Sequence, residues 1–225
     1  MTIHRPGRPE DLPPGEVLWA RWALLAAVEA TTEAEERPAV HRTGHWIDGA
    51  GLHRDDSGCT WWILSRGGEG RFVLYGEDES SDVKWHRPPI DMLAGCPDWL
   101  PHGELRDRLE GYELGCVYWY EDGAWSRAPY PDSLKDDGLD CGLGDFVDRD
   151  RLLGELALHI DDAAAVLADA EAHRLEARLL LDRLGPTDPD GAPRDLPAVA
   201  RSLDRAILAG RTTALQDSGR PGAEA

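Results

Sequence analysis

The sequence predicts an α+β fold in which one antiparallel sheet is covered by helices. Two observations support this: two Trp-rich hairpins lie in the central part of the 225-residue chain, and helical patterns precede and follow them. Strands grouped together and followed by grouped helices are typical of α+β domains, whereas alternating strands and helices would indicate a parallel sheet. A chain of this length can bury a substantial core.

The clearest hairpin covers residues 115–131. Its first strand, at 117–120, consists of β-branched and aromatic residues, which fit a pleated and half-buried surface. The pair Asp122 and Gly123 then predicts a tight turn, because both residues tolerate the positive φ that such turns need. The return strand begins at Trp125 and ends before prolines that cannot donate to a strand ladder.

An earlier segment repeats this pattern. Residues 58–62 (Gly-Cys-Thr-Trp-Trp) resemble residues 115–119 (Gly-Cys-Val-Tyr-Trp), and they lead into a Gly-rich turn and a second strand at 71–75. We expect the two hairpins to form the body of a single sheet.

The remaining elements follow from hydrophobic periodicity. Leu18, Trp22 and Leu25 share one face of a predicted helix that covers residues 15–37. The other predicted elements are a strand at 40–46, a loop at 49–56, a short strand at 83–86, a short helix at 90–100 and a helical turn at 104–110.

These elements suggest three parts of the chain. Residues 1–14 are expected to be a flexible lead, and residues 15–184 one domain, with a sheet region at 40–131, an acidic loop at 132–150 and helices at 151–184. Residues 185–197 contain four prolines, so we interpret residues 185–225 as a linker, a short helix at 198–208 and a disordered tail from Gly210, dispensable for the fold.

The net charge of −19 argues against several classes of partner. So acidic a chain repels nucleic acid phosphates and anionic membranes, and we expect neither as a partner.

No run approaches the roughly 20 apolar residues of a membrane span, and the N-terminus lacks the apolar run of a signal peptide. The four cysteines have no close spacing, which favours a cytoplasmic protein with reduced thiols; they are Cys59, Cys96, Cys116 and Cys141.

Known catalytic signatures are missing from the sequence. There is no Gly-x-Ser-x-Gly elbow, no phosphate-binding loop and no His-Glu-x-x-His motif. His53 with Cys59, and Cys96 with His102, are spaced more widely than the usual zinc pairs. The acidic loops lack the ligand order of a calcium-binding loop. We therefore expect no metal and no cofactor.

Two groups of residues are candidates for a binding site. The acidic loop after the first hairpin contributes carboxylates that would attract a basic partner: Glu77, Asp78, Glu79 and Asp82. The strands contribute aromatic side chains for an aromatic surface: Trp62, Trp119 and Trp125. Because Trp61 and Trp62 are adjacent on a strand, they are expected to point to opposite faces of the sheet.

The run at 117–139 (Val-Tyr-Trp-Tyr-Glu-Asp-Gly-Ala-Trp-Ser-Arg-Ala-Pro-Tyr-Pro-Asp-Ser-Leu-Lys-Asp-Asp-Gly-Leu), with Gly-Arg-Phe-Val-Leu-Tyr-Gly-Glu-Asp at 70–78, resembles uncharacterised actinobacterial proteins. The preference for arginine over lysine, with abundant Ala, Gly and Asp, is typical of such high-GC genomes. The resemblance covers about the central half of the chain and implies no activity.

Three functional hypotheses remain open. The first is a non-enzymatic interaction module that neutralises or regulates a basic protein partner, as immunity proteins do. The second is an enzyme with an aromatic-lined groove that uses His45, His53 or His86 with carboxylates such as Asp55 and Asp56. The third is a structural protein that oligomerises through its C-terminal helices.

Overall fold

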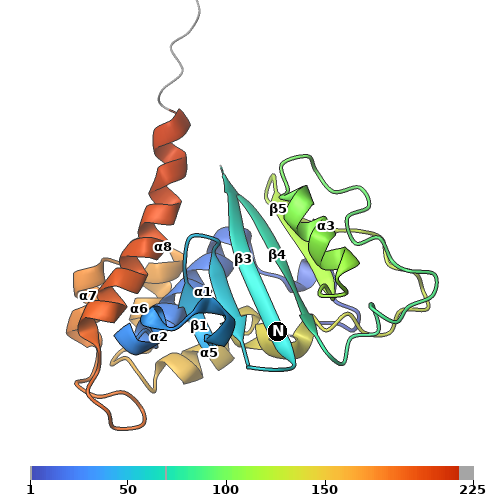
Figure 1. Cartoon of the computed structure of the whole chain (residues 1–225). Coiled ribbons are helices and arrows are strands. Elements are labelled where there is room, and N and C mark those ends of the chain that lie inside the picture. The colour runs from blue at the N-terminus through green and yellow to red at the C-terminus, as the bar shows by residue number, and fades with distance from the viewer. Residues whose placement is uncertain (1, 69, 218–225) are drawn as a thin grey trace, which may run out of the picture.

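The computed structural model describes residues 2–68 and 70–217, and it confirms the α+β fold. Within these residues six strands form one antiparallel sheet, and each strand pairs with its neighbour in the sequence (Figure 1). The strands are β1 (Gly44–Ile47), β2 (Leu52–Asp55), β3 (Thr60–Gly68), β4 (Arg71–Asp78), β5 (Cys116–Glu121) and β6 (Ala124–Arg127).

The two predicted hairpins are β3–β4 and β5–β6, and they lie in one sheet as expected. They are joined directly, because β4 pairs with β5 in a register that places Phe72 opposite Tyr120 and Tyr75 opposite Val117. The link between β4 and β5 is a long excursion that contains α3 (His102–Glu110), close to the helical turn predicted there.

Other predicted strands and helices were wrong. Strand β2 occupies the predicted loop, and the strand expected from residue 40 begins only at Gly44, after the single turn η2 (Ala39–His41). Residues 83–86 form turns instead of a strand, and residues 90–100 form turns instead of a helix. Val83, Met92, Leu93 and Leu100 from these stretches are buried in the core on one face of the sheet, so hydrophobicity there does not indicate regular structure.

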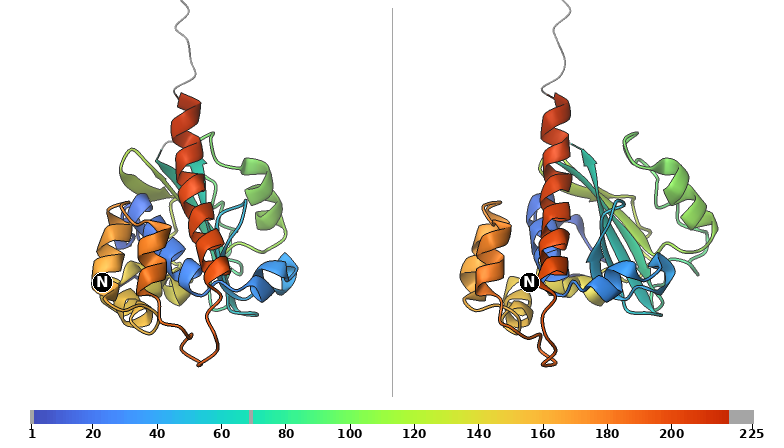
Figure 2. Two further views of the ribbon diagram at one scale, coloured as in Figure 1. Left: turned by 90° about the vertical axis from the view of Figure 1, so that its left-hand side faces the viewer. Right: turned by 60° about the vertical axis from the view of Figure 1, so that its left-hand side comes forward.

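Both faces of the sheet are covered, as Figure 2 shows from two directions. Alternate strand residues point to opposite faces. One face packs against α1 (Gly15–Val28) through Trp62, Leu64, Phe72, Leu74 and Tyr118. The other face packs against α3 and the excursion through Ile63, Val73, Tyr75, Val117 and Trp119.

The single helix predicted over 15–37 is two helices. Helix α1 ends at Val28, and α2 (Thr32–Glu36) begins after Thr31, whose hydroxyl oxygen accepts a hydrogen bond from the Ala34 amide at 3.1 Å. A threonine at this position satisfies an amide at the start of a helix. A short turn therefore separates the two helices where the sequence pattern alone appears continuous.

The region of the helices predicted at 151–184 is divided into shorter helices than expected, whereas the last helix is longer than the one expected at 198–208. The helices of the C-terminal half are α4 (Asp140–Val147), α5 (Arg149–Leu156), α6 (Ala163–Glu171), α7 (Ala177–Arg183) and α8 (Leu196–Asp217). The acidic stretch at 132–150 is thus partly helical, and Asp148 caps α5 by accepting hydrogen bonds from the amides of Asp150 and Arg151. Among the described helices, none is both long enough and apolar enough to cross a membrane.

The N-terminal segment, expected to be flexible, packs against the body of the protein. Ile3 and Leu12 are buried. The Gly7 amide donates to the Asp137 carboxylate at 2.9 Å, and the Trp125 indole donates to the Pro13 carbonyl at 2.6 Å. Side chains from distant parts of the chain bind this backbone, which explains why its local composition did not indicate order.

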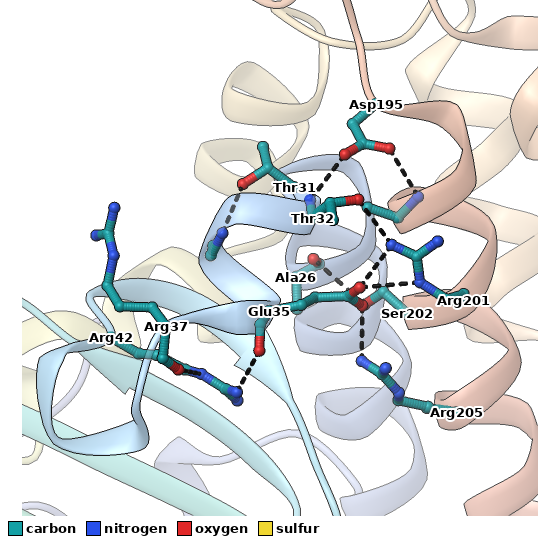
Figure 3. A network of polar contacts seen from close by, with 12 residues as sticks. Ala26, Thr31, Thr32, Glu35, Arg37, Arg42, Asp195, Arg201, Ser202 and Arg205 are labelled. Carbon is teal, nitrogen blue, oxygen red and sulfur yellow. Dashed lines mark hydrogen bonds and ion pairs between the residues drawn. The ribbon is translucent and has the colours of Figure 1, made fainter.

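Helix α8 also belongs to the core, although its region was expected to be dispensable. Ala198, Val199, Leu203 and Ala206 are buried, and Figure 3 shows the polar contacts that hold the helix against α2. Glu35 accepts from Arg201 and from Arg205, each at 2.7 Å, and Asp195 accepts from the Thr32 amide at 2.7 Å.

Residues 210–217, predicted to be disordered, continue the helix, and the rest of that predicted tail, 218–225, lies outside the described residues.

We predict that the buried face of α8 contributes strongly to stability. Replacing Leu203, which is 5% exposed, with alanine should lower the free energy of unfolding by about 2–4 kcal/mol, because a buried leucine leaves a cavity. Leu196 lies on the same helix but is 41% exposed, so Leu196→Ala should cost under ~1 kcal/mol. Urea unfolding of both variants measures the difference, and equally small losses would mean that α8 is dispensable.

Candidate functional site

Two acidic loops meet at one end of the sheet. The Asp82 amide, after β4, donates to the Asp136 carbonyl at 3.0 Å, and the Glu79 amide donates to the Cys59 carbonyl at 2.8 Å. Gly138 lies so close to Asp78 that an added Cβ would be 2.9 Å from the Asp78 Cβ. We call the carboxylates gathered here the acidic end: Asp56, Glu77, Glu79, Asp82, Glu113, Asp136 and Asp140.

The four carboxylates predicted from the sequence have different roles. Glu79 and Asp82 are exposed. Glu77 is largely buried and forms an ion pair with Lys84 at 2.7 Å. Asp78 is buried and accepts hydrogen bonds from the hydroxyls of Thr60 and Ser80. Only Glu79 and Asp82 are therefore free to face a partner, while Glu77 and Asp78 hold the loop.

Burial and like charge both act on these carboxylates. Burial raises the pKa of Glu77, its ion pair with Lys84 opposes the rise, and the neighbouring Glu113 and Glu79 add to it. Burial likewise raises the pKa of Asp136. The proximity of carboxylates makes the ionised form of each group less favourable, as expected when charges of one sign share a site.

Arg5 from the N-terminal segment partly offsets this repulsion. Its guanidinium forms an ion pair with Asp140 at 2.6 Å and lies 3.7 Å from Asp136. More than half of the Arg5 side chain remains exposed, so solvent screens the interaction. Arg5 and Lys84 thus neutralise the inner carboxylates, and Arg108 lies 3.5 Å from Glu113. Among the described residues, Asp56, Glu79 and Asp82 have no ion-pair partner.

The three tryptophans predicted to form an aromatic surface are buried instead. Trp62 donates from its indole nitrogen to the Cys141 carbonyl at 2.7 Å, Trp125 donates to the Pro13 carbonyl, and Trp119 packs under the excursion. Both faces of the sheet are covered, so aromatic residues on its strands belong to the core. Trp61 does point to the face opposite Trp62, as its adjacency predicted, and it is half-buried.

Two other aromatic side chains are exposed at the acidic end. Trp85 is 71% exposed and follows Lys84, which is the ion-pair partner of Glu77. Tyr112 is 61% exposed at a backbone φ of 60°, and it precedes Glu113, which acts on Glu77 electrostatically. Trp85 was expected on a strand at 83–86, with its side chain in the core or on the second face of the sheet, but it lies in a turn. Tyr112 was not selected from the sequence.

The histidines of the enzyme hypothesis do not converge. The His45 Nδ1 atom lies 2.7 Å from the carboxylate of Glu29, which directly follows α1, on the face opposite His53. His53 binds Asp48 at 2.8 Å instead of Asp55 or Asp56. Burial tends to raise the pKa of Asp48, but the hydrogen bond from His53 and further donors outweigh it and lower the pKa to about 2. His86 lies apart from both, beside Ser133.

The described residues contain no cluster of three or more His, Cys, Asp or Glu side chains arranged to hold a metal ion. The strongest pair is Cys96 and His102, whose Sγ and Nδ1 atoms are 3.8 Å apart.

The surface has a small cavity of about 80 Å³ between α1, α2, β1 and α8, and a shallow hollow of about 470 Å³ beside Trp61. Neither is lined by a residue of the acidic end.

Comparisons of the chain with protein-family models, with curated proteins and with solved structures give no match.

We predict that the two acidic loops are packed tightly at Gly138. Gly138 has a φ of 77°, and its added Cβ would contact Asp78, whereas Gly123 has a φ of 82° with no atom within 4 Å of an added Cβ. Gly123→Ala should cost about 1–2 kcal/mol of stability for backbone strain alone. Gly138→Ala should cost about 1–3 kcal/mol more, because the loops must also move apart. Urea unfolding compares the two variants, and equal losses would show that the contact between the loops is loose.

Proposed function

We propose that the chain is a protein-interaction module that binds a basic partner through the acidic end and its exposed aromatic residues, and that it acts as a regulator or an immunity-like inhibitor of that partner. The observation that carries this proposal is the exposure of Trp85 three residues after Asp82, in the same segment that exposes the carboxylates of Glu79 and Asp82. Tryptophan is enriched among the residues that dominate binding energy at interfaces.

The chemistry of this surface fits arginine and lysine side chains. Carboxylates form charge-assisted hydrogen bonds with guanidinium and ammonium groups. An indole face attracts the same cations through its π electrons. The net charge of −19 adds a long-range field of the same sign, which speeds the approach of a basic protein.

The inner carboxylates give this surface a fixed shape. Glu77 is held by Lys84, and Asp78 is held by two hydroxyls, so the loop that presents Glu79 and Asp82 is already ordered before a partner arrives. Preorganisation of this kind lowers the entropy cost of binding.

The cysteines support a cytoplasmic site of action. All four are free thiols, and the exposed Cys59 would be open to oxidation outside a reducing compartment. We therefore place the proposed interaction in the cytoplasm.

The test uses an arginine–glycine repeat peptide as a defined basic probe, with stopped-flow measurement of association and dissociation. The double variant Glu79→Gln/Asp82→Asn should slow association at low salt several-fold, with a much smaller effect on dissociation, because rim charges act mainly on the association rate. Trp85→Ala should speed dissociation by about 30-fold, the equivalent of roughly 2 kcal/mol at a dominant interface residue.

The matched control is Glu155→Gln/Asp190→Asn, which removes the same charge from exposed positions on the C-terminal half. Association should be nearly unchanged in this control. Equal slowing by both double variants would reduce the effect to net charge, and a Trp85→Ala variant with unchanged dissociation would overturn the proposed surface.

A further inference from the structure

A serine and a histidine form a hydrogen-bonded pair next to the acidic end. The Nε2 atom of His86 lies 2.8 Å from the Ser133 Oγ, and the Nδ1 atom of the same ring lies 2.8 Å from the Pro88 carbonyl oxygen. Ser133 is exposed and His86 is half-buried, so small molecules in solution can reach the hydroxyl. The pair joins two segments that are 47 residues apart in the chain.

These contacts fix the tautomer of the neutral ring. A carbonyl oxygen can only accept, so Nδ1 must carry the hydrogen that it donates to Pro88. In the neutral imidazole Nε2 then holds a lone pair, and the Ser133 hydroxyl donates to it. A nucleophile bonded to a base, with the base oriented by a third group, is the arrangement that activates serine for covalent catalysis.

Both members of the pair are held in place by the fold. Ser133 lies in a turn closed by the Leu134 amide, which donates to the Pro131 carbonyl at 3.0 Å, and Leu134 itself is buried. The segment of His86 is tied to the segment of Ser133 by the hydrogen bond from the Asp82 amide to the Asp136 carbonyl. The geometry therefore does not depend on two freely moving side chains.

Other serine hydroxyls have a different kind of partner. Ser57 donates to the Asp56 carbonyl at 2.6 Å, and Ser65 donates to the Ala50 carbonyl at 2.5 Å. A backbone carbonyl accepts a hydrogen bond but does not remove a proton at neutral pH. Ser57 is exposed like Ser133, so it provides a matched unactivated hydroxyl within the same chain.

We propose that Ser133 is a nucleophile with His86 as its general base, and that it accepts acyl groups from small aryl esters. The exposed indole of Trp85, next to His86 in the chain, offers an apolar surface for the aryl group. This activity is separate from the proposed binding of a basic partner and does not require it.

The reaction has two balanced steps. First, the Ser133 Oγ attacks the ester carbonyl carbon while its proton passes to His86 Nε2; the bond to the aryloxy group breaks, and the aryloxide takes that proton. Second, water attacks the acyl-serine while His86 accepts a proton from it; the acid leaves, and the proton returns to the Ser133 oxygen. No oxidant, reductant or metal is needed.

The experiment treats the full chain with p-nitrophenyl acetate and maps acetylated residues by peptide mass spectrometry. Ser133 should be acetylated and Ser57 should not. His86→Gln keeps a polar side chain but removes the base, and it should slow acetylation of Ser133 by about 100-fold or more, the usual contribution of general base catalysis. Added imidazole should restore acetylation in His86→Ala, which a purely structural role of His86 would not permit.

Background labelling is easy to separate, because the chain has only two lysines, Lys84 and Lys135. Circular dichroism checks that each variant is folded. Acetylation of Ser57 at the rate of Ser133, or acetylation of Ser133 that is unaffected by His86→Gln, would overturn the proposal. So would a folded His86→Ala variant in which imidazole has no effect.

Discussion

Helix α1 is apolar around its whole circumference, and the rest of the structure depends on covering it. A helix of this kind is stable only when it is buried on every side. One side packs on the sheet, where the Trp22 indole donates to the His53 carbonyl, and the Trp22 ring stacks on Phe146 of α4. The remaining sides are covered by α6 and α8. This requirement draws α8 into the core, although it follows a proline-rich stretch that resembles a linker.

An element can be predicted from the sequence when the residues that determine it lie close together in the chain. The hairpins β3–β4 and β5–β6 could be predicted, because alternation and turn residues such as Asp122 and Gly123 act over a few positions. The N-terminal segment and α8 could not, because their order comes from partners more than 100 residues away. Arg21 illustrates this: it is buried within α1 and donates to the carbonyls of Phe146 and Val147 and to Glu171, and none of these partners is visible from the sequence around it.

The site was predictable in its charge but not in its geometry. Sequence reasoning found the acidic loop after β4, yet it could not separate Glu77 and Asp78, which fix the loop, from Glu79 and Asp82, which face outward. The candidate tryptophans were residues of predicted strands. Because both faces of the sheet are covered, Trp62, Trp119 and Trp125 are buried. An aromatic residue outside regular structure, such as Trp85, was the better indicator of an exposed surface.

The architecture itself places the acidic end, where we propose that a partner binds, at the end of the sheet. With both faces covered, the turns and loops at the strand ends remain as free surface, and here they concentrate carboxylates beyond the reach of Arg5 and Lys84. Burial and mutual repulsion raise the pKa values of Glu77 and Asp136. A cation that binds beside them favours the ionised form and lowers those pKa values again. The proposed basic partner would therefore relieve a repulsion that the fold creates.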